Sequence, residues 1–398
     1  MNKRKIFNDP VYGFVSITYE IIFDLIEHPW VQRLRHISQL GLTHLIYPGA
    51  LHTRFHHAIG ALHLMTLAID SLRSKGVEIS KSEAEAVSIA ILLHDIGHGS
   101  YSHALEGVLV DAHHEELSIF LMQRLNRDFN GALTLAIAIF RNEYHKRFLH
   151  QLISSQLDMD RMDYLNRDSF YSGVMEGKIG YDRIIKMLQV KDDHLVVEEK
   201  GIYSIEKFLV ARKIMYWQVY LHKTVLAAEL MLIAAIERAK VLYRSGELTL
   251  DGPLQSLFDL SWKETSNQEE IIDAFLKIDD HDVVILLKNS FLCSDYILRT
   301  LSTGLIQRRL FAVELSSSPF KTEYIEEIVA SIAERLGLSE KTVNDLSWSG
   351  SVRTDTYSDR QDEIKILLKD HQVLNLSGLQ GYHSVTDSVE KFYFCHIK

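Results

Sequence analysis

An apolar run that ends in a His-Asp pair constrains this chain more than any other feature. Residues 87–93 read VSIAILL, and His94 and Asp95 follow at once, with glycines and further histidines up to residue 103. Apolar residues at the spacing of a buried helix face, followed by polar residues and glycines, predict a helix that carries its chemistry at its C-terminal end. His and Asp side chains suit a divalent metal. The pair therefore predicts either a metal site or a hydrogen-bonded buried pair.

A second His-Asp pair in the same chain serves as an internal comparison. His281 and Asp282 lie in a charged stretch, DDHDVV, and no apolar run leads into them. We expect this pair to face solvent and to have no function. The buried approach and the additional histidines are what distinguish His94 and Asp95.

Length and composition place the chain among large globular proteins. Its 398 residues suffice for one large domain and a smaller one, and 46% hydrophobic and 24% charged residues are ordinary for a soluble protein. A net charge of −10 argues against nucleic acid as a partner, because proteins that coat it have basic surfaces. Two cysteines indicate a reducing compartment. Without a signal-peptide core or a membrane-length apolar run, we expect a cytoplasmic protein with no membrane partner.

Hydrophobic periodicity predicts a mostly α-helical chain. We expect an all-helical unit over residues 1–244 and a smaller α+β unit over residues 245–398, where the pattern alternates more like strands. A hairpin is expected from residues 194–197 and 202–204. The predicted helices are 16–27, 31–40, 57–73, 82–94, 115–125, 132–140, 148–156, 159–168, 181–188, 205–243 and 322–336, and the later strands are 309–315, 364–368, 373–376 and 392–396.

A catalytic metal needs more donors than one His-Asp pair, and two other stretches offer them. The first is HTRFHH at residues 52–57, at the start of a predicted helix. The second is LDMDRMDYLNRD at residues 157–168, where helical spacing puts Asp160, Tyr164 and Asp168 on one stripe. The alternative for this second stretch is a solvated helix held by i,i+4 ion pairs. Apolar residues within it and before it favour a half-buried helix.

These residues carry a resemblance to a known family. The order His57, His94-Asp95, Asp160 resembles the H…HD…D signature of the HD-domain phosphohydrolases. Longer blocks are similar to the deoxynucleoside triphosphate (dNTP) triphosphohydrolases, which include bacterial dNTPases and the human HD-domain factor that depletes dNTPs. These blocks, within residues 5–239, are QRLRHISQLG (32–41), YPGALHTRFHHAIG (47–60), LLHDIGHGSYSH (92–103), HEELS (114–118) and SSQLDMDRMDYLNRDSFYSG (154–173).

The resemblance implies a fold, a metal and a reaction. The fold is an HD-domain helical bundle, and the reaction is hydrolysis of a dNTP to the deoxynucleoside and triphosphate. One divalent ion, either Mn, Fe, Zn, Ni or Mg, would lower the pKa of its bound water from 15.7 towards roughly 7. The implied metal ligands are His57, His94, Asp95 and Asp160.

The resemblance also implies roles for side chains around the metal. The leaving 5′ oxygen needs a proton, and His103 with Glu106 resembles the family's catalytic His–acid pair. His114, rather than His113, and His98 stand at further active-site positions, although each alone fits a hydrogen-bonded or exposed histidine equally well. The implied substrate-binding residues are Arg54, Arg161 and Arg212 at the phosphates, Tyr164 and Asp168 at the sugar, Gln39 and Leu40 beside sugar and base, and Tyr220 against the deoxyribose.

Two consequences concern selectivity and regulation. A 2′-hydroxyl would clash with the ring of Tyr220, which predicts a preference for deoxyribose; the alternative is a core aromatic. Residues 5–10 and 27–35 resemble segments that bind an activating nucleotide between subunits of a homo-dimer or homo-tetramer. Glu27 replaces the guanine-reading Asp of the family, and Tyr12 replaces a His. The alternative for these segments is a helix that packs subunits together.

Three classes of function compete. The leading hypothesis is a metal-dependent dNTP triphosphohydrolase. The second keeps the metal but makes the chain an HD-type phosphomonoesterase or phosphodiesterase for another nucleotide. The third is a non-enzymatic nucleotide-binding or nucleic-acid-binding protein with a residual metal site. The intact set of four ligands and the pair of His103 and Glu106 count against this third class.

Overall fold

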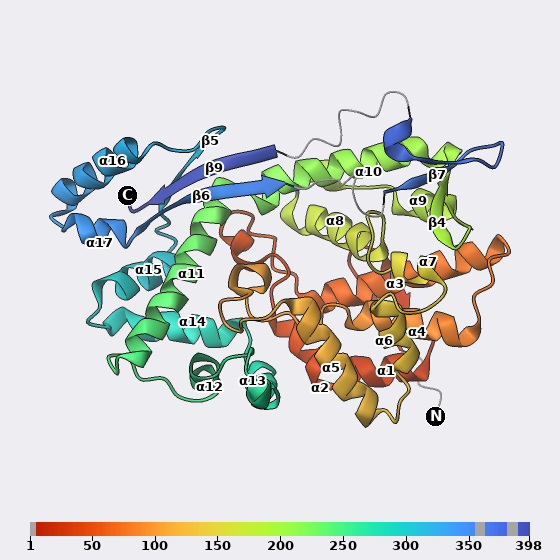
Figure 1. Cartoon of the computed structure of the whole chain (residues 1–398), viewed down its shortest axis with the longest axis horizontal. Helices are drawn as coiled ribbons and strands as arrows, with labels where there is room; N and C mark the ends of the chain where they lie inside the picture. Colours follow the sequence, from red (N-terminus) through yellow and green to blue (C-terminus); the bar gives the residue numbers. More distant parts are fainter. Residues whose placement is uncertain (1–4, 355–362, 380–388) are drawn as a thin grey trace.

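The computed structural model describes residues 5–354, 363–379 and 389–398. Within these ranges the chain is mostly helical, with a smaller α+β region towards its C-terminus, so the predicted fold class is confirmed (Figure 1). The helices of the first part are α1 (Glu20–Glu27), α2 (Pro29–Gln32), α3 (Arg54–Ser74), α4 (Lys81–Leu93), α5 (His114–Asp128), α6 (Thr134–Phe140), α7 (Arg147–Gln151), α8 (Met159–Ser172), α9 (Tyr181–Met187), α10 (Ile202–Met215) and α11 (Lys223–Arg244).

Helices α3, α4 and α8 form the centre of the bundle. Most residues of α4 are buried, and Ser80 with Glu83 forms a capping box that fixes where this helix begins. Helix α3 packs against both α4 and α8. Gly60 allows the close approach of α8, because a Cβ there would lie 2.0 Å from Asp163 Oδ1 and from Arg167 Nη2. The side chains of Asp163 and Arg167 in α8 can therefore lie against the backbone of α3 at Gly60.

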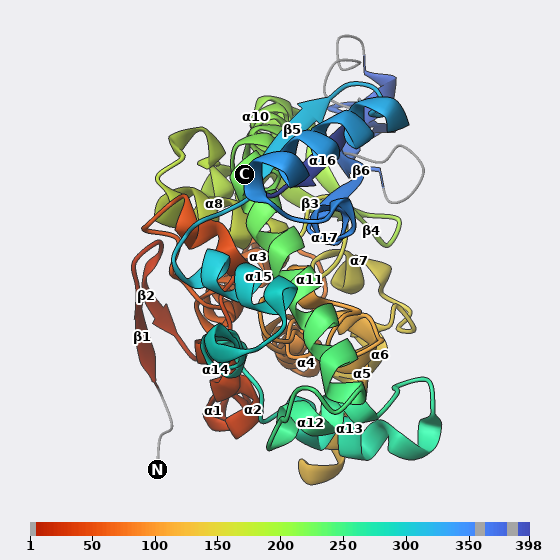
Figure 2. The same cartoon turned by 90° about the vertical axis from the view of Figure 1, so that its left-hand side faces the viewer.

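Within the described ranges, the C-terminal part adds the helices α12 to α17 and a three-stranded sheet. The sheet is antiparallel, with the order β5-β9-β6, and α16 and α17 lie beside it (Figure 2). Strand β6 was not expected from the sequence, since its segment SWSGSVRT is mostly small and polar. The elements are α12 (Pro253–Asp259), α13 (Gln268–Phe275), α14 (Asp280–Asn289), α15 (Tyr296–Ile306), α16 (Thr322–Leu336), α17 (Glu340–Asn344), β5 (Ala312–Ser316), β6 (Ser347–Thr354) and β9 (Val389–His396).

A second sheet links the two parts of the chain. Its order is β3-β4-β7-β8, from β3 (Leu188–Lys191), β4 (His194–Glu198), β7 (Lys365–Leu367) and β8 (Val373–Asn375), and β4 pairs with β7 in parallel. One large hydrophobic cluster also contains residues from both sides of position 244, such as Leu232 and Leu298. A division into residues 1–244 and 245–398 therefore remains a prediction, with a shared sheet and a shared core across it.

The sequence did not predict the hairpin at the N-terminus. Strands β1 (Ile6–Asp9) and β2 (Gly13–Ser16) pair antiparallel at one edge of the molecule (Figure 2). Because Ser16 belongs to β2, the helix expected at residues 16–27 begins only at Glu20.

The expected hairpin of residues 194–197 and 202–204 was wrong. Strand β4 pairs with β3, which precedes it, and residues 202–204 begin α10. The turn lies at Asp192 and Asp193, whose φ angles of 51° and 61° are left-handed. Asp tolerates this conformation better than most residues, and two such residues in succession suit a two-residue hairpin turn.

Two predicted helices are interrupted. The segment 31–40 divides into α2 and a 3-10 turn, η1 (Arg33–His36), and then extends, because Ser38 N–H donates to Asp280 Oδ2 at 2.8 Å instead of continuing the helix. The stretch 205–243 breaks at a π turn, η6 (Tyr216–Tyr220), between α10 and α11. Among the described residues no single helix has the length and apolarity to cross a bilayer; residues 199–220 and 223–244 meet those two criteria only as a pair bent by 57°.

Candidate active site

Three segments far apart in the sequence bring imidazoles and carboxylates together. His57 lies in the first turn of α3, His94 directly follows α4, and Asp160 lies in the first turn of α8. The Nε2 atoms of His57 and His94 are 3.3 Å apart. Asp160 Oδ1 lies 3.1 Å from Nε2 of His57 and 3.6 Å from that of His94. Asp95 joins them, with Oδ1 3.3 Å from Nε2 of His94.

In its neutral form, each of the two imidazoles directs a lone pair towards this cluster. His94 Nδ1 lies 2.6 Å from the carbonyl oxygen of Ile91, and because a carbonyl can only accept, Nδ1 carries the proton. His57 Nδ1 donates to Asp163 Oδ2 at 2.7 Å for the same reason. In the neutral rings both Nε2 atoms are then acceptors, and they face carboxylate oxygens as well as each other. Acceptors crowded in this way are stabilised by positive charge among them, either a proton or a bound cation.

A buried ion-pair chain stands behind His57. Asp163 accepts hydrogen bonds from Nε and Nη2 of Arg167, each at 2.9 Å, and Arg167 Nη1 donates to Asp9 Oδ2 at 2.8 Å. All of these side chains are buried. Burial lowers the pKa of His57, but its hydrogen bonds to Asp160 and Asp163 outweigh this and raise that pKa to about 10. The surroundings therefore favour positive charge at His57.

Asp95 is held on both of its oxygens. Oδ2 pairs with Nη1 of Arg54, whose Nε donates to Ser102 Oγ at 2.7 Å. Oδ1 lies 3.3 Å from Nε2 of His98. Burial raises the pKa of Asp95, but the charges of Arg54 and of the neighbouring histidines outweigh it and hold that pKa well below its usual range. Asp95 is therefore a carboxylate, and Arg54 fixes its orientation.

The donor set fits a divalent metal. Imidazole nitrogens and carboxylate oxygens are the usual ligands of Zn, Mn and Fe. His57 also has the carboxylate partner on its far nitrogen that metal-bound histidines typically have. His57, His94 and Asp160 offer ligand atoms within 4.8 Å of one another, and Asp95 adds a second carboxylate beside them. These residues could hold one metal ion.

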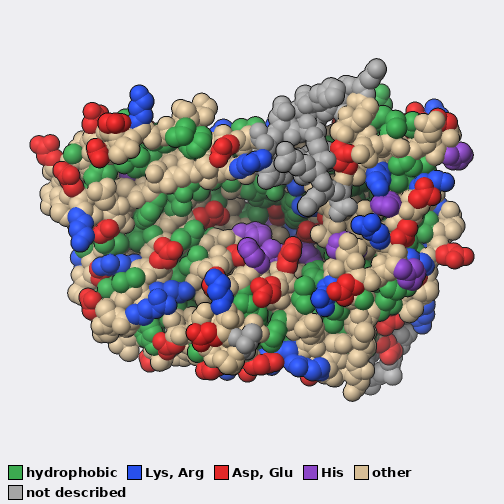
Figure 3. All heavy atoms as spheres, viewed as in Figure 1, with side chains coloured by type: hydrophobic (Ala, Val, Ile, Leu, Met, Phe, Trp, Pro, Cys, Tyr) green, Lys and Arg blue, Asp and Glu red, His purple; other side chains and the backbone are tan. Residues whose placement is uncertain are grey.

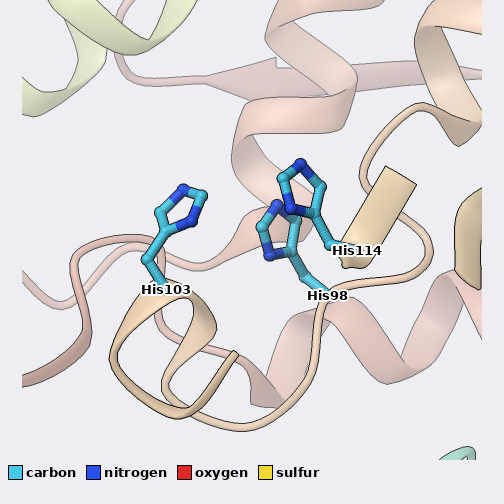
Figure 4. Close-up of side chains that lie close together, drawn as sticks. All are labelled: His98, His103 and His114. Atoms are coloured by element: carbon cyan, nitrogen blue, oxygen red, sulfur yellow. The ribbon is translucent and has the colours of Figure 1, made fainter. Parts of the chain in front are cut away.

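Three further histidines face one another next to this cluster (Figure 4). His98 lies in the loop after α4, His103 in the 3-10 turn η3 (Ser102–Leu105), and His114 opens α5. The rings of His98 and His114 stack with their centroids 4.0 Å apart, and the ring of His103 stands nearly perpendicular to that of His98 at 4.9 Å. A nitrogen of each ring lies within 4.8 Å of the others. Such a group can donate hydrogen bonds to an anion.

Glu106 holds two of these rings by one nitrogen each. Its Oε2 lies 3.0 Å from His103 Nδ1, and its Oε1 lies 2.7 Å from His114 Nδ1. Burial raises the pKa of Glu106, but these hydrogen bonds outweigh it and lower the pKa far below its usual value. The ionised carboxylate therefore orients both imidazoles and leaves their Nε2 atoms free. His114 faces the group, whereas the side chain of His113 is 90% exposed.

Short backbone contacts hold the loop that carries these histidines. A Cβ on Gly97 would lie 2.3 Å from the carbonyl oxygen of His114, so only glycine fits there. Ser118 Oγ accepts from the N–H of Gly97 at 3.0 Å and donates to the carbonyl of His94 at 2.8 Å. The start of α5 is thereby tied to the end of α4.

A residue of the C-terminal part fixes the far side of the same loop. Tyr101 and Ser102 have left-handed φ angles of 53° and 47°, a backbone conformation that costs free energy in residues other than glycine. Asp280 Oδ1 accepts from the N–H of Tyr101 at 2.8 Å and from Ser100 Oγ at 3.1 Å. Sequence reasoning missed Asp280, because no local pattern connects it to a loop 180 residues earlier.

A cavity of about 500 Å³ opens beside both clusters. Figure 3 shows histidine side chains gathered near the middle of this face, where the surface is hollowed. Of the proposed site residues, the cavity is lined by Gln39, Leu40, Arg54, Asp95, His98, His103, His114, Asp160, Arg161, Tyr164, Asp168 and Tyr220, and the other lining residues include Gly41, Thr43, Ala104, Glu115, Leu221 and Glu229.

The stripe expected on α8 faces this cavity. Asp160, Tyr164 and Asp168 all line it. Asp168 is held on both sides, since Tyr220 Oη donates to its Oδ2 at 2.8 Å and His52 Nε2 lies 2.7 Å from its Oδ1. The sequence offered His52 only as one of several histidines in HTRFHH and gave it no role.

The proposed phosphate-binding arginines differ in their surroundings. Arg161 lines the cavity and lies within 3.5 Å of Tyr164 Oη. Arg212 is buried, donates to Gln156 Oε1 at 3.0 Å and does not belong to the described lining of the cavity.

The second His-Asp pair, used as the internal comparison, has a solvent-facing histidine: the side chain of His281 is 73% exposed, as expected.

The chain is similar to a protein family with an HD associated region and to several proteins of bacteria and eukaryotes. The family described as an HD associated region matches residues 179–247. The uncharacterized protein YwfO of Bacillus subtilis is 31% identical over 389 residues, which cover 95% of this chain and 88% of that protein. The deoxynucleoside triphosphate triphosphohydrolase SAMHD1 homolog of Dictyostelium discoideum is 30% identical over 255 residues, covering 59% of this chain and 49% of that protein.

A solved structure matches along the whole chain. A phosphohydrolase from Bacteroides thetaiotaomicron superposes with a TM-score of 0.94 and 48% sequence identity, and the match covers all of both chains. A hypothetical protein from Aquifex aeolicus superposes with a TM-score of 0.74 at 27% identity, over 99% of this chain and 96% of that one.

Proposed function

Because this chain belongs to the HD-domain phosphohydrolase family related to the dNTP triphosphohydrolases, we propose that it hydrolyses a dNTP to the deoxynucleoside and inorganic triphosphate. The observation that carries the proposal is the buried cluster of acceptors around His57 and His94, next to the histidines held by Glu106. Both open on a cavity of about 500 Å³, a volume suited to a small-molecule ligand.

HD phosphohydrolases depend on metal ions, and we propose that His57, His94, Asp95 and Asp160 hold one divalent ion here, either Mn, Fe, Zn, Ni or Mg. Such an ion, when bound, polarises a phosphoryl oxygen and makes its bound water a stronger acid. Arg54 and Asp163 would orient two of the ligands through hydrogen bonds of their own.

The remaining groups divide the work around the substrate. Arg161 and, when protonated, the imidazole of His114 would donate hydrogen bonds to the triphosphate oxygens, and His98, whose Nε2 faces Asp95 Oδ1, would lie beside them. His103 would give a proton to the departing 5′ oxygen, and Glu106 on its Nδ1 would orient the ring. Arg212, which is buried and donates to Gln156, would act on the phosphates only if Gln156 releases it.

Sugar recognition would come from Asp168 and Tyr220, which also line the cavity. Asp168 has two oxygens already fixed by Tyr220 and His52, with lone pairs left to accept from a 3′-hydroxyl. The ring of Tyr220 would occupy the space of a 2′-hydroxyl, which gives the preference for deoxyribose. Tyr164, Gln39 and Leu40 complete this proposed sugar and base site.

The test is product analysis with a matched pair of variants. The chelator-stripped protein is reloaded with each metal and given each dNTP in H₂¹⁸O, and triphosphate is separated from phosphate by ion exchange. We expect triphosphate that carries the ¹⁸O, because water attacks the α-phosphorus. Asp160→Asn should abolish turnover, whereas His281→Ala, in the surface His-Asp pair, should leave it unchanged.

Other products would change the assignment. Release of phosphate or pyrophosphate, or turnover only of a phosphomonoester or a phosphodiester, would support another HD-type activity. Unchanged dNTP turnover in Asp160→Asn would exclude the proposed metal chemistry altogether.

Regulation by a nucleotide between subunits of a homo-dimer or homo-tetramer stays a prediction from the resemblance. Glu27, which stands at the guanine-reading position, forms an ion pair with Lys5. An activating base would have to displace Lys5 before it could pair with this carboxylate.

A further inference from the structure

The active-site cavity contains one carboxyl group that the proposed chemistry does not use. Glu229 lies in α11 and lines the cavity. Among residues 5–354, 363–379 and 389–398 it has no hydrogen-bond or ion-pair partner. Glu229 is half-buried, and a carboxyl group that faces a cavity without a partner is available to bind a ligand.

The described part of the chain offers Glu229 no cation as an ion-pair partner. Helix α11 packs against η2 (Gly41–Leu45), which contributes Gly41 and Thr43 to the cavity lining, and against η3, which contributes Ser102, His103 and Ala104. Burial raises the pKa of Glu229 to about 7. Since the triphosphate requires cations, we assign the part of the cavity at Glu229 to the nucleobase.

We propose that Glu229 recognises the nucleobase of the substrate and selects guanine. This inference rests on the proposed dNTP hydrolysis. An ionised carboxylate offers acceptors only. Guanine presents two adjacent donors, N1–H and the 2-amino group, and can form two hydrogen bonds with the two oxygens. Adenine and cytosine place one amino donor beside a ring acceptor, and thymine places its single N–H between two carbonyls, so each brings an acceptor against the carboxylate.

The substrate side gives a first test without any change to the protein. At pH 8, where the carboxylate dominates, kcat/KM should be highest for dGTP. Deoxyinosine triphosphate lacks the 2-amino group and keeps N1–H, so its kcat/KM should be about 10-fold lower than that of dGTP. Equal values for these two substrates would overturn the inference.

The protein side uses Glu229→Gln, which keeps the shape of the side chain. The amide replaces one acceptor with a donor, so kcat/KM for dGTP should fall about 10-fold or more, while that for dATP and dCTP changes by less than about 3-fold. The matched control is Glu237→Gln, in the same helix but exposed, and it should change neither.

A structural role is distinguished by stability. If Glu229 served the fold, Glu229→Gln would lower the melting temperature and reduce the turnover of all dNTPs alike. Under our inference the variant is at least as stable as the wild type, because a buried charge is removed. If Glu229→Gln shows the same order of kcat/KM among the dNTPs as the wild type, the inference about Glu229 is wrong but the proposed function stands. If the wild type hydrolyses no dNTP, the proposed function itself is wrong.

Discussion

Replacing Asp163 by Asn tests the link between the buried ion-pair chain and the metal ligands. Asp163 Oδ2 accepts from His57 Nδ1 at 2.7 Å and from Arg167 Nε at 2.9 Å, and Oδ1 accepts from Arg167 Nη2. An asparagine has one oxygen and one NH₂ group. If its oxygen faces His57, its NH₂ meets the N–H of Arg167. If it flips, the NH₂ faces His57 Nδ1 and moves the ring proton to Nε2, where the metal would bind.

The expected magnitude follows from both costs. Loss of a residue that orients a metal-bound histidine typically weakens metal affinity 10- to 100-fold, or about 1.4–2.8 kcal/mol. A fully buried arginine that loses one of two counter-charges should also cost about 2–4 kcal/mol of folding free energy. We would measure metal affinity by chelator competition, and stability by urea unfolding of the metal-free protein.

The control removes the same counter-charge from Arg167 without touching His57. Asp9 accepts from Arg167 Nη1 at 2.8 Å, so Asp9→Asn should lower stability by a similar amount and leave metal affinity within about 3-fold of the wild type. The reasoning is refuted if Asp163→Asn binds metal as tightly as the wild type, or if Asp9→Asn loses as much affinity as Asp163→Asn.

Three further variants test other parts of the site and the fold. Asp280→Ala removes the acceptor that holds Tyr101 in its left-handed conformation. In the product assay kcat should therefore fall about 10-fold or more, and KM should change less. An unchanged kcat would show that the loop keeps its conformation without Asp280. Tyr220→Phe loses the hydrogen bond to Asp168 but keeps the ring, so KM for dNTPs should rise about 10-fold while ribonucleotides stay excluded; turnover of ribonucleotides would show that the ring is not the barrier. Burial raises the pKa of Glu83, but the hydrogen bonds of this carboxyl group outweigh burial and lower the pKa from 4.5 to about 2. The carboxylate therefore stabilises the fold above pH 4.5, and its contribution to the free energy of unfolding is lost as the pH falls towards 2. The stability difference between wild type and Glu83→Gln, by urea unfolding, should be up to about 3 kcal/mol at pH 6 and shrink towards pH 2; a difference independent of pH would contradict this.

Local patterns in the sequence were sufficient for the helices that carry the chemistry. Helix α16 begins and ends at the residues expected. Helix α4 begins and ends one residue earlier than predicted, and α9 ends one residue earlier than predicted. The stripe of Asp160, Tyr164 and Asp168 follows from helical spacing alone, and all three line the cavity. These features depend on residues within one or two turns of one another, which a linear sequence displays directly.

Pairings across long separations were not available from local patterns. Residues 31–40 have helical spacing, yet Asp280, some 240 residues later, takes the backbone N–H of Ser38 and ends the helix. Residues 194–197 pair with the strand before them, and in parallel with β7 from the far end of the chain, because both partners cover the same core.

The sequence by itself determined the helical architecture and which residue types could hold a metal, because periodicity and side-chain chemistry are local properties. Only the tertiary structure decided the tautomers of His57 and His94, the buried pairing of Asp163 with Arg167, and the isolation of Glu229. Each of these depends on what lies opposite a side chain in space. A carboxyl group reads the same in the sequence whether an arginine, an imidazole or an open cavity faces it.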